Sequence, residues 1–395
     1  MTLRLERFYC KECENFVPSC LCHTYASSHS WLDDESRAIV VESLCSSGYL
    51  LFSAESCTLH VTQELHRCSS LFFSSPLEIK TAACSKDRAR RGYSPLDTEN
   101  FAALIGTKDK PNDKVEKYRY GPIVDTHRHQ QLELEQESYF LSKAAKVHFF
   151  PNAIENLDQD YQQALEQYYK LMEKLSLCIL YILEAAFYLE EGTLTGPSKS
   201  PYHTSILSIN HYPLDSSIPS KAERVAEHTD VSLFTIVTEV GHLHDIFPHV
   251  DTPVVPPKLN TQLQIVNRHT NEWIDIELGS EQFLVNIGDY LQYVSEGRLH
   301  SARHRVINLE DGNVPRESFA YFCTPRYDAV IDWRPTTLEH TDRGGNRGDN
   351  SKTFKSTDNI LVEDIPEDEG YARELSYHEF RKAKIAKVVK SLRSK

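Results

Sequence analysis

The chain has 395 residues, a formal net charge of −14 and a pI near 5.7. A surface this acidic repels phosphate backbones and anionic lipids, which argues against non-specific binding to nucleic acid or to membranes. The hydrophobic share of 40% and the charged share of 25% are ordinary for a soluble globular protein. No apolar run approaches the roughly 18 residues that would cross a bilayer.

The first segment, residues 1–35, predicts an irregular N-terminal arm. Its charged start lacks the apolar stretch of a signal peptide, so we expect a cytoplasmic protein whose thiols stay reduced. The arm contains four clustered cysteines: Cys10, Cys13, Cys20 and Cys22. Their spacing leaves structural zinc open, but the second pair is tighter than in a standard finger, which favours free thiols.

Residues 36–200 predict a helical and mixed region. Apolar positions at helical spacing predict helices over 36–48, 58–73 and 158–190. Between the first two, YLLFS predicts a short strand. The polar stretch 84–125 contains KDKPNDKVEK, which we interpret as a solvated loop without chemistry of its own.

Residues 201–330 predict an all-β core. Short β-prone runs separated by Gly, Asn, Asp and Pro are typical of a sandwich, jelly roll or barrel. The Pro-rich stretch 241–262 interrupts them and predicts a long loop inserted between strands, and loops of this length are usually functional or disordered. We interpret its histidines, His242, His244 and His249, as lid or solvent-exposed residues and not as metal ligands.

Residues 331–395 predict a linker followed by a C-terminal helical tail. The linker is rich in Gly, Asp, Arg and Thr, and the tail turns from acidic to basic. We interpret the lysine-rich side of the tail as a solvated face, because charge runs on predicted helices usually face water.

Candidate metal ligands occur in Glu227-His228-Thr229-Asp230. In extended chain, residues i and i+2 point to one face, so His228 and Asp230 can reach one ion. His304, at the head of a later predicted strand, supplies a third ligand. Two histidines and one carboxylate form the facial triad of non-haem Fe(II) oxygenases, which leaves coordination positions open. With 18 histidines in the chain, the H-x-D motif alone would be weak evidence.

A second set of residues predicts an anchor for a 2-oxo acid. Arg316 and Ser318 share one face of the predicted strand RESFAYF, and an arginine fork with a hydroxyl suits a carboxylate. Tyr212, in NHYP on a separate strand, offers a hydroxyl that would complete this pocket.

These motifs, in this order, resemble the isopenicillin N synthase-like family of Fe(II)- and 2-oxoglutarate-dependent dioxygenases. The matching segments are NHYP at 210–213, HTDVSLFTIV at 228–237, LVNIGDYLQYVSEGRLHSARHRV at 284–306 and RESFAYF at 316–322. The resemblance implies a mainly β fold with flanking α-helices around a distorted double-stranded β-helix, a cupin-like jelly roll.

The resemblance also implies a function. Fe(II), 2-oxoglutarate and O2 would oxidise a small molecule of specialised metabolism by hydroxylation, desaturation or oxidative ring closure, with release of succinate and CO2. The implied metal ligands are His228, Asp230 and His304, and the implied 2-oxoglutarate ligands are Arg316, Ser318, Tyr212 and Asn210.

Two alternatives remain open at this point. An iron-dependent oxidase of the same fold would not need 2-oxoglutarate, and a non-catalytic jelly-roll binding protein would not turn over at all. Among partners we expect a small-molecule substrate, no nucleic acid and no membrane, and we expect a monomer. The identity of the substrate does not follow from the motifs.

Overall fold

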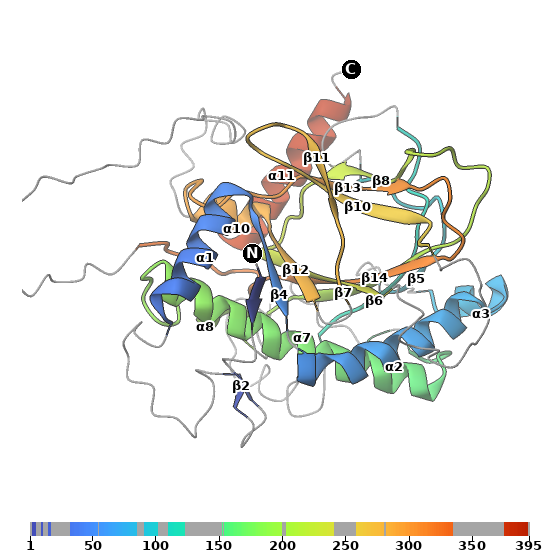
Figure 1. The fold of residues 1–395 in the computed structure, drawn as a ribbon, viewed down its shortest axis with the longest axis horizontal. Coiled ribbons are helices and arrows are strands. Elements are labelled where there is room, and N and C mark those ends of the chain that lie inside the picture. Colours follow the sequence, from blue (N-terminus) through green and yellow to red (C-terminus); the bar gives the residue numbers. More distant parts are fainter. Residues whose placement is uncertain are drawn as a thin grey trace, which may run out of the picture.

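The computed structural model describes residues 32–334, apart from 54, 85–90, 102–109, 123–151, 153, 200–202, 241–257 and 280–281. It also describes 2–4, 9–10, 15–16 and 375–393. Over these ranges two β-sheets lie face to face, and helices cover the outer face of the larger sheet (Figure 1). No helix in these ranges has the length and apolar character needed to cross a membrane.

The larger sheet contains eight strands among the described residues. It is antiparallel except at one edge, where the first two strands run parallel. The order is β1 (Thr2–Arg4), β4 (Tyr49–Ser53), β12 (Gln282–Ile287), β9 (Phe234–Val240), β14 (Arg316–Cys323), β7 (Ile206–Tyr212), β6 (Glu116–Tyr120) and β5 (Gly92–Ser94). Strands from both sides of residue 200 therefore share one sheet.

The smaller sheet contains four antiparallel strands that face the larger one. Their order is β11 (Trp273–Ile276), β10 (Thr261–Val266), β13 (His304–Asn308) and β8 (Glu223–His228). Buried side chains from both sheets, including Val225, Ile265, Leu284 and Val306, form an apolar cluster between them. The predicted jelly-roll core is confirmed.

The helices pack mainly against the outer face of the larger sheet. α7 (Gln159–Ala186) and α2 (Glu55–Phe73) lie under it (Figure 1). The Tyr168 hydroxyl of α7 forms a hydrogen bond of 2.7 Å with Thr238 Oγ1, and its ring contacts Phe319 edge to face. The remaining helices are α1 (Asp34–Ser46), α3 (Leu77–Ala82), α8 (Thr195–Ser198), α10 (Asp289–Val294) and α11 (Tyr377–Arg393). The three long helices predicted before residue 200 and a helical tail are thus present.

The N-terminal arm differs from the prediction of an irregular segment. β1 pairs in parallel with β4, and Leu3 is buried against the core. A second short pair, β2 (Tyr9–Cys10) and β3 (Asn15–Phe16), follows. An edge strand of three residues carries too little periodicity to be recognised from sequence. The side chains of the four arm cysteines lie outside the described residues.

The prediction that KDKPNDKVEK, residues 108–117, forms a solvated loop was wrong at the end of this segment. β6 begins at Glu116, and Glu116 and Lys117 are both buried. Their charges are satisfied inside the protein, because Lys80 Nζ lies 2.6 Å from Glu116 Oε2 and Lys117 is paired with Glu99. Buried ion pairs make a strand look like a solvated charge run in sequence.

The inserted loop is shorter than predicted at its end, because β10 begins at Thr261. Residues 241–257, with His242, His244 and His249, lie outside the described residues. The predicted linker also lies outside them from residue 335 to residue 374.

Candidate metal centre

The three predicted metal ligands come together on the smaller sheet. His228 ends β8, His304 begins β13, and the two are cross-strand partners. Asp230 follows in the loop before β9, so a strand end rather than a continuous strand brings it to the same face. Asp230 Oδ1 lies 3.8 Å from His228 Nε2 and 3.9 Å from His304 Nε2. One ligand atom from each residue lies within 4.8 Å of the others.

Both histidines present Nε2 to this cluster. His228 Nδ1 lies 2.8 Å from Ala226 O, and His304 Nδ1 lies 3.0 Å from Ala302 O. A carbonyl oxygen only accepts hydrogen bonds, so each Nδ1 carries the proton and each Nε2 has a free lone pair. This fixed tautomer is the one that metal-binding histidines need.

Asp230 is held by its other oxygen. Thr235 Oγ1 donates to Oδ2 at 2.6 Å, and Asn286 Nδ2 donates to the same atom at 3.0 Å. Oδ1 therefore faces the two histidines. Sequence reasoning assigned no role to Thr235 or Asn286, although both lie inside the motifs at 228–237 and 284–306.

The electrostatics of the cluster suit a divalent cation. Burial and the neighbouring His304 lower the pKa of His228 to about 3, so its imidazole is neutral near pH 7. Burial alone would raise the pKa of Asp230, but His304 and His228 outweigh it and lower that pKa. Two imidazoles and one carboxylate, with no fourth ligand among the described residues, match the donor set of an open Fe(II) site.

The segment behind the triad is tied to the C-terminal helix. Lys384 of α11 forms an ion pair with Asp289 and donates to Thr229 Oγ1 at 3.3 Å. Asp289 N in turn donates to Asp230 O at 2.7 Å. The tail therefore supports the loop that carries the carboxylate ligand.

The predicted 2-oxo acid anchor lies across from the triad, on the larger sheet. Arg316 and Ser318 of β14 pair with Tyr212 and Asn210 of β7, so all four side chains share one face. Arg316 is 1% exposed, and its guanidinium lies 5.3 Å from the centre of the Tyr212 ring. Asn210 Nδ2 lies 3.4 Å from Ser318 Oγ.

One nitrogen of Arg316 is buried without a partner. Arg316 Nε donates to Glu239 Oε1 at 2.7 Å, but Nη1 has no hydrogen-bond partner in the described part of the chain. A buried donor left unpaired is costly, and a carboxylate would satisfy it. The residues present therefore fit 2-oxoglutarate. Sequence reasoning assigned no role to Glu239, which accepts the hydrogen bond from Arg316 Nε, because Glu239 lies on a neighbouring strand.

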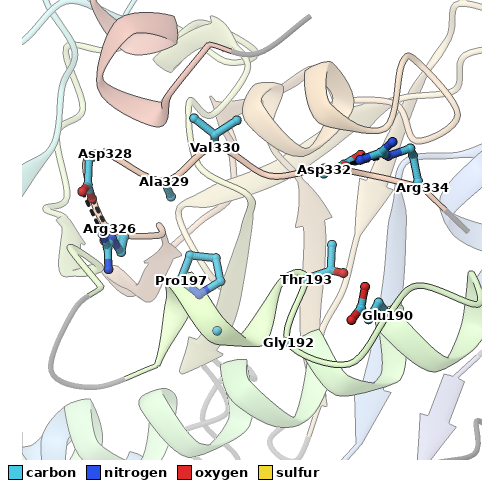
Figure 2. A pocket seen from close by; sticks show the side chains of 11 residues that line it. Glu190, Gly192, Thr193, Pro197, Arg326, Asp328, Ala329, Val330, Asp332 and Arg334 are labelled. Carbon is cyan, nitrogen blue, oxygen red and sulfur yellow. Dashed lines mark hydrogen bonds and ion pairs between the residues drawn. The ribbon is translucent and has the colours of Figure 1, made fainter. Parts of the chain in front are cut away.

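A cavity of about 720 Å³ lies elsewhere, beside α8 and the segment after β14 (Figure 2). In it Arg326 Nε lies 2.7 Å from Asp328, and Arg334 pairs with Asp332. Its lining includes no residue of the triad or of the anchor. The cavity is thus separate from the candidate metal centre.

The sequence and the structure are similar to those of known proteins. A model of the 2OG-Fe(II) oxygenase superfamily matches residues 203–325, a span that contains both the triad and the anchor. Clavatol oxidase of Penicillium crustosum is 24% identical over 78% of this chain and 84% of its own length. A 2-oxoglutarate-Fe(II) type oxidoreductase of Metarhizium majus is 28% identical over 74% of this chain and 79% of its own.

A solved structure has the same fold. A full-length protein of Neurospora crassa, crystallised in complex with alpha-KG, superposes with a TM-score of 0.61. The alignment covers 98% of this chain and 95% of the other, at 16% sequence identity. At this identity the likeness concerns the architecture.

Proposed function

Because this chain belongs to the 2OG-Fe(II) oxygenase superfamily, we propose that His228, Asp230 and His304 bind its catalytic Fe(II). The protein is a non-haem iron, 2-oxoglutarate-dependent dioxygenase that oxidises a small molecule and releases succinate and CO2. The observation that carries the residue assignment is the convergence of two free Nε2 atoms and one Asp230 oxygen within 4.8 Å.

When bound, Fe(II) supplies the activation of O2 that couples decarboxylation of 2-oxoglutarate to oxidation of the substrate. The chain's own residues prepare this chemistry. Arg316 Nη1 receives the distal carboxylate of 2-oxoglutarate, and Tyr212 and Ser318 line the same pocket. Thr235 and Asn286 orient Asp230, and the Ala226 and Ala302 carbonyls orient the histidines. Burial of the ligands keeps bulk water away from the reacting atoms.

We propose that the substrate is a small organic molecule of specialised metabolism, as the name of clavatol oxidase indicates for that relative. Hydroxylation, desaturation and ring closure all remain outcomes of the same site. We propose that the regions 36–200 and 201–330 form one oxygenase unit, to which the arm at 1–35 and the tail at 331–395 are attached. We further propose that the protein is a cytoplasmic monomer. The shared eight-stranded sheet supports the union of the first two.

The test compares His228→Ala and Asp230→Ala with His269→Ala, which changes an exposed turn residue. We expect both triad variants to lose Fe(II) binding in anaerobic titration, and succinate formation with any accepted compound. The His269 variant should behave as the wild type. Turnover that does not require 2-oxoglutarate would point to the iron oxidase of the same fold, and normal turnover in Asp230→Ala would exclude the assigned triad.

A further inference from the structure

Two buried cations lie on the interior face of β6, outside the site described so far. Lys117 pairs in register with Asn210, and Arg119 pairs with Ser208, so both share the face that carries the anchor residues. Their side chains are only 6% and 15% exposed. Buried cations on a sheet face require either a countercharge or a ligand.

One carboxylate serves both cations. Lys117 Nζ lies 2.9 Å from Glu99 Oε2, and Arg119 Nη2 lies 2.6 Å from the same atom. Burial alone would raise the pKa of Glu99, but the two cations outweigh it and lower it to about 2. Burial lowers the pKa of Lys117 to about 8, which still leaves the ammonium charged near pH 7. The three groups together carry one excess positive charge.

A further carboxylate, Asp113, forms no ion pair with either cation. Asp113 accepts hydrogen bonds from the backbone of Phe101 at 2.8 Å and of Ala226 at 3.0 Å. Burial raises the pKa of Asp113, while the charge of Lys117 acts in the opposite direction. Asp113 interacts with Lys117 through its charge but forms no ion pair with it, so Glu99 is the only carboxylate in direct contact with Lys117 and Arg119 among the described residues.

The cluster lies one aromatic ring away from the metal ligands. Lys117 Nζ is 4.0 Å from the centre of the Phe101 ring, and that ring is 4.7 Å from the ring of His228. The charge of Lys117 is also among the influences that keep the pKa of His228 low. Lys117 therefore belongs to the wall of the active site.

This wall is distinct from the 2-oxoglutarate anchor. Lys117, Asn210 and Ser318 are successive members of one row across β6, β7 and β14. Neighbouring strands lie about 4.8 Å apart, so roughly 10 Å separates the backbones of Lys117 and Ser318. The anchor already offers Arg316 to the cosubstrate, which leaves Lys117 for a different anionic group.

We propose that Lys117, held by Glu99 and backed by Arg119, binds a carboxylate of the organic substrate and thereby places the oxidisable carbon at the metal centre. This inference rests on the proposed function, because it takes the triad as the reacting centre. A carboxylate is ionised near pH 7 and forms strong charge-assisted hydrogen bonds with buried cations. A neutral ligand would leave Lys117 and Arg119 with Glu99 as their only carboxylate in direct contact.

The test measures binding without turnover. Full-length protein loaded with Mn(II) and 2-oxoglutarate, without O2, is titrated with matched acid and amide pairs: phenylacetate with phenylacetamide, and cinnamate with cinnamamide. A phenol series, with 4-propylphenol as probe, forms a third arm. Binding is followed by thermal shift and by calorimetry. We expect the acids to bind at least about tenfold more tightly than the amides and the phenol.

Lys117→Met should reduce the preference for acid over amide to near one, without changing the affinity for Mn(II) or 2-oxoglutarate. Lys117→Arg should restore it. Lys114→Met is the matched control, because Lys114 is partly exposed and pairs with Asp97. Since loss of one partner of a buried ion pair can prevent folding, the double variant Lys117→Met with Glu99→Gln removes both charges together.

Three results would overturn the inference. They are equal binding of acid and amide by the wild type, an acid preference that survives in folded Lys117→Met or in the folded double variant, and a preference for the phenol. Failure of the proposed function looks different, since the wild type would then bind no Mn(II) or 2-oxoglutarate. If both still bind and only the acid preference is absent, the substrate proposal alone is wrong.

Discussion

The two oxygens of Asp230 have different roles, and this difference organises the metal centre. Oδ2 accepts hydrogen bonds from Thr235 and Asn286, while Oδ1 faces the two histidines. A carboxylate that rotates freely must give up rotational entropy when it binds a metal, and it is less often aligned for binding. Loss of a residue that orients a metal ligand typically weakens metal affinity by about 10- to 100-fold.

Thr235→Val and Asn286→Ala should therefore weaken metal binding without removing a ligand. We expect the dissociation constant for Fe(II), or for Mn(II) as a stable substitute, to rise by about 10- to 100-fold in either variant. The physical reason is that Oδ2 loses one of its two hydrogen bonds, so the direction of Oδ1 is less well fixed. Anaerobic titration followed by calorimetry measures the change.

Thr238→Val is the control for the threonine variant, because Thr238 is also buried on β9 but bonds to Tyr168 on the helical side. It should destabilise the fold without altering metal affinity. Equal losses of metal affinity in Thr235→Val and Thr238→Val would show that general loosening of β9, and not the orientation of Asp230, is responsible.

At the residue scale, motif reasoning selected His228, Asp230 and His304 from their short spacing and their order along the chain, and the structure brings these three side chains together. It assigned no role to Thr235, Asn286 or Glu239. Each of these acts through a hydrogen bond to a residue on another strand or loop, and the register of strands is set by packing that a single sequence does not display.

Among the elements, β14 is linked on its outer face to α2 by a buried carboxylate. Glu317 Oε2 lies 3.1 Å from His66 Nδ1 and 2.5 Å from Ser69 Oγ, and Oε1 lies 3.1 Å from His211 Nδ1. The ring of His211 also stacks on Phe73 at the end of α2. The strand that carries Arg316 is therefore joined to a helix by a network around its next residue.

This link predicts a dependence of stability on pH. Burial alone would raise the pKa of Glu317, but hydrogen bonds from His211 and His66 lower it from 4.5 to about 2. Because the folded pKa lies below the unfolded one, ionised Glu317 stabilises the fold above about pH 4.5. That contribution, about 3 kcal/mol at most, is lost as the pH falls towards 2.

Glu317→Gln should accordingly lower the free energy of unfolding by up to about 3 kcal/mol at pH 7. The difference from the wild type should shrink below pH 4.5. Urea unfolding at pH 7, 5, 4 and 3 measures it, with Glu64→Gln on the exposed face of α2 as control. A difference that stays constant from pH 7 to pH 3 would mean that the carboxylate charge is not what joins β14 to α2.

The elements themselves were predictable where apolar spacing is long and regular, as in α7, whose stripe from Tyr161 to Ala186 is buried. The region of β6 was misread. Its charges look solvated in sequence, yet Lys117 and Glu116 are buried because partners distant along the chain, Glu99 and Lys80, neutralise them. Such pairing depends on the finished fold and has no local signal.

For the whole molecule, the two halves of the active site belong to different sheets. The proposed metal ligands lie on or beside β8 and β13 of the smaller sheet, and the proposed anchor lies on β7 and β14 of the larger one. A cosubstrate that contacts both the metal and Arg316 would bridge the two sheets. Its binding should then depend on the metal, because neither half alone holds both of its ends.

Thermal unfolding tests this coupling. At about 100 times its dissociation constant, a ligand that binds only the folded state adds about 2.7 kcal/mol. We expect 2-oxoglutarate to raise the melting temperature clearly when Mn(II) is present and little when it is absent. The double variant Arg316→Met with Glu239→Gln, which removes a buried ion pair as a unit, should keep the Mn(II) shift and lose the 2-oxoglutarate increment. If 2-oxoglutarate raised the melting temperature equally with and without Mn(II), the triad and the anchor would be two independent sites. One cosubstrate would then not bridge the two sheets of the jelly roll.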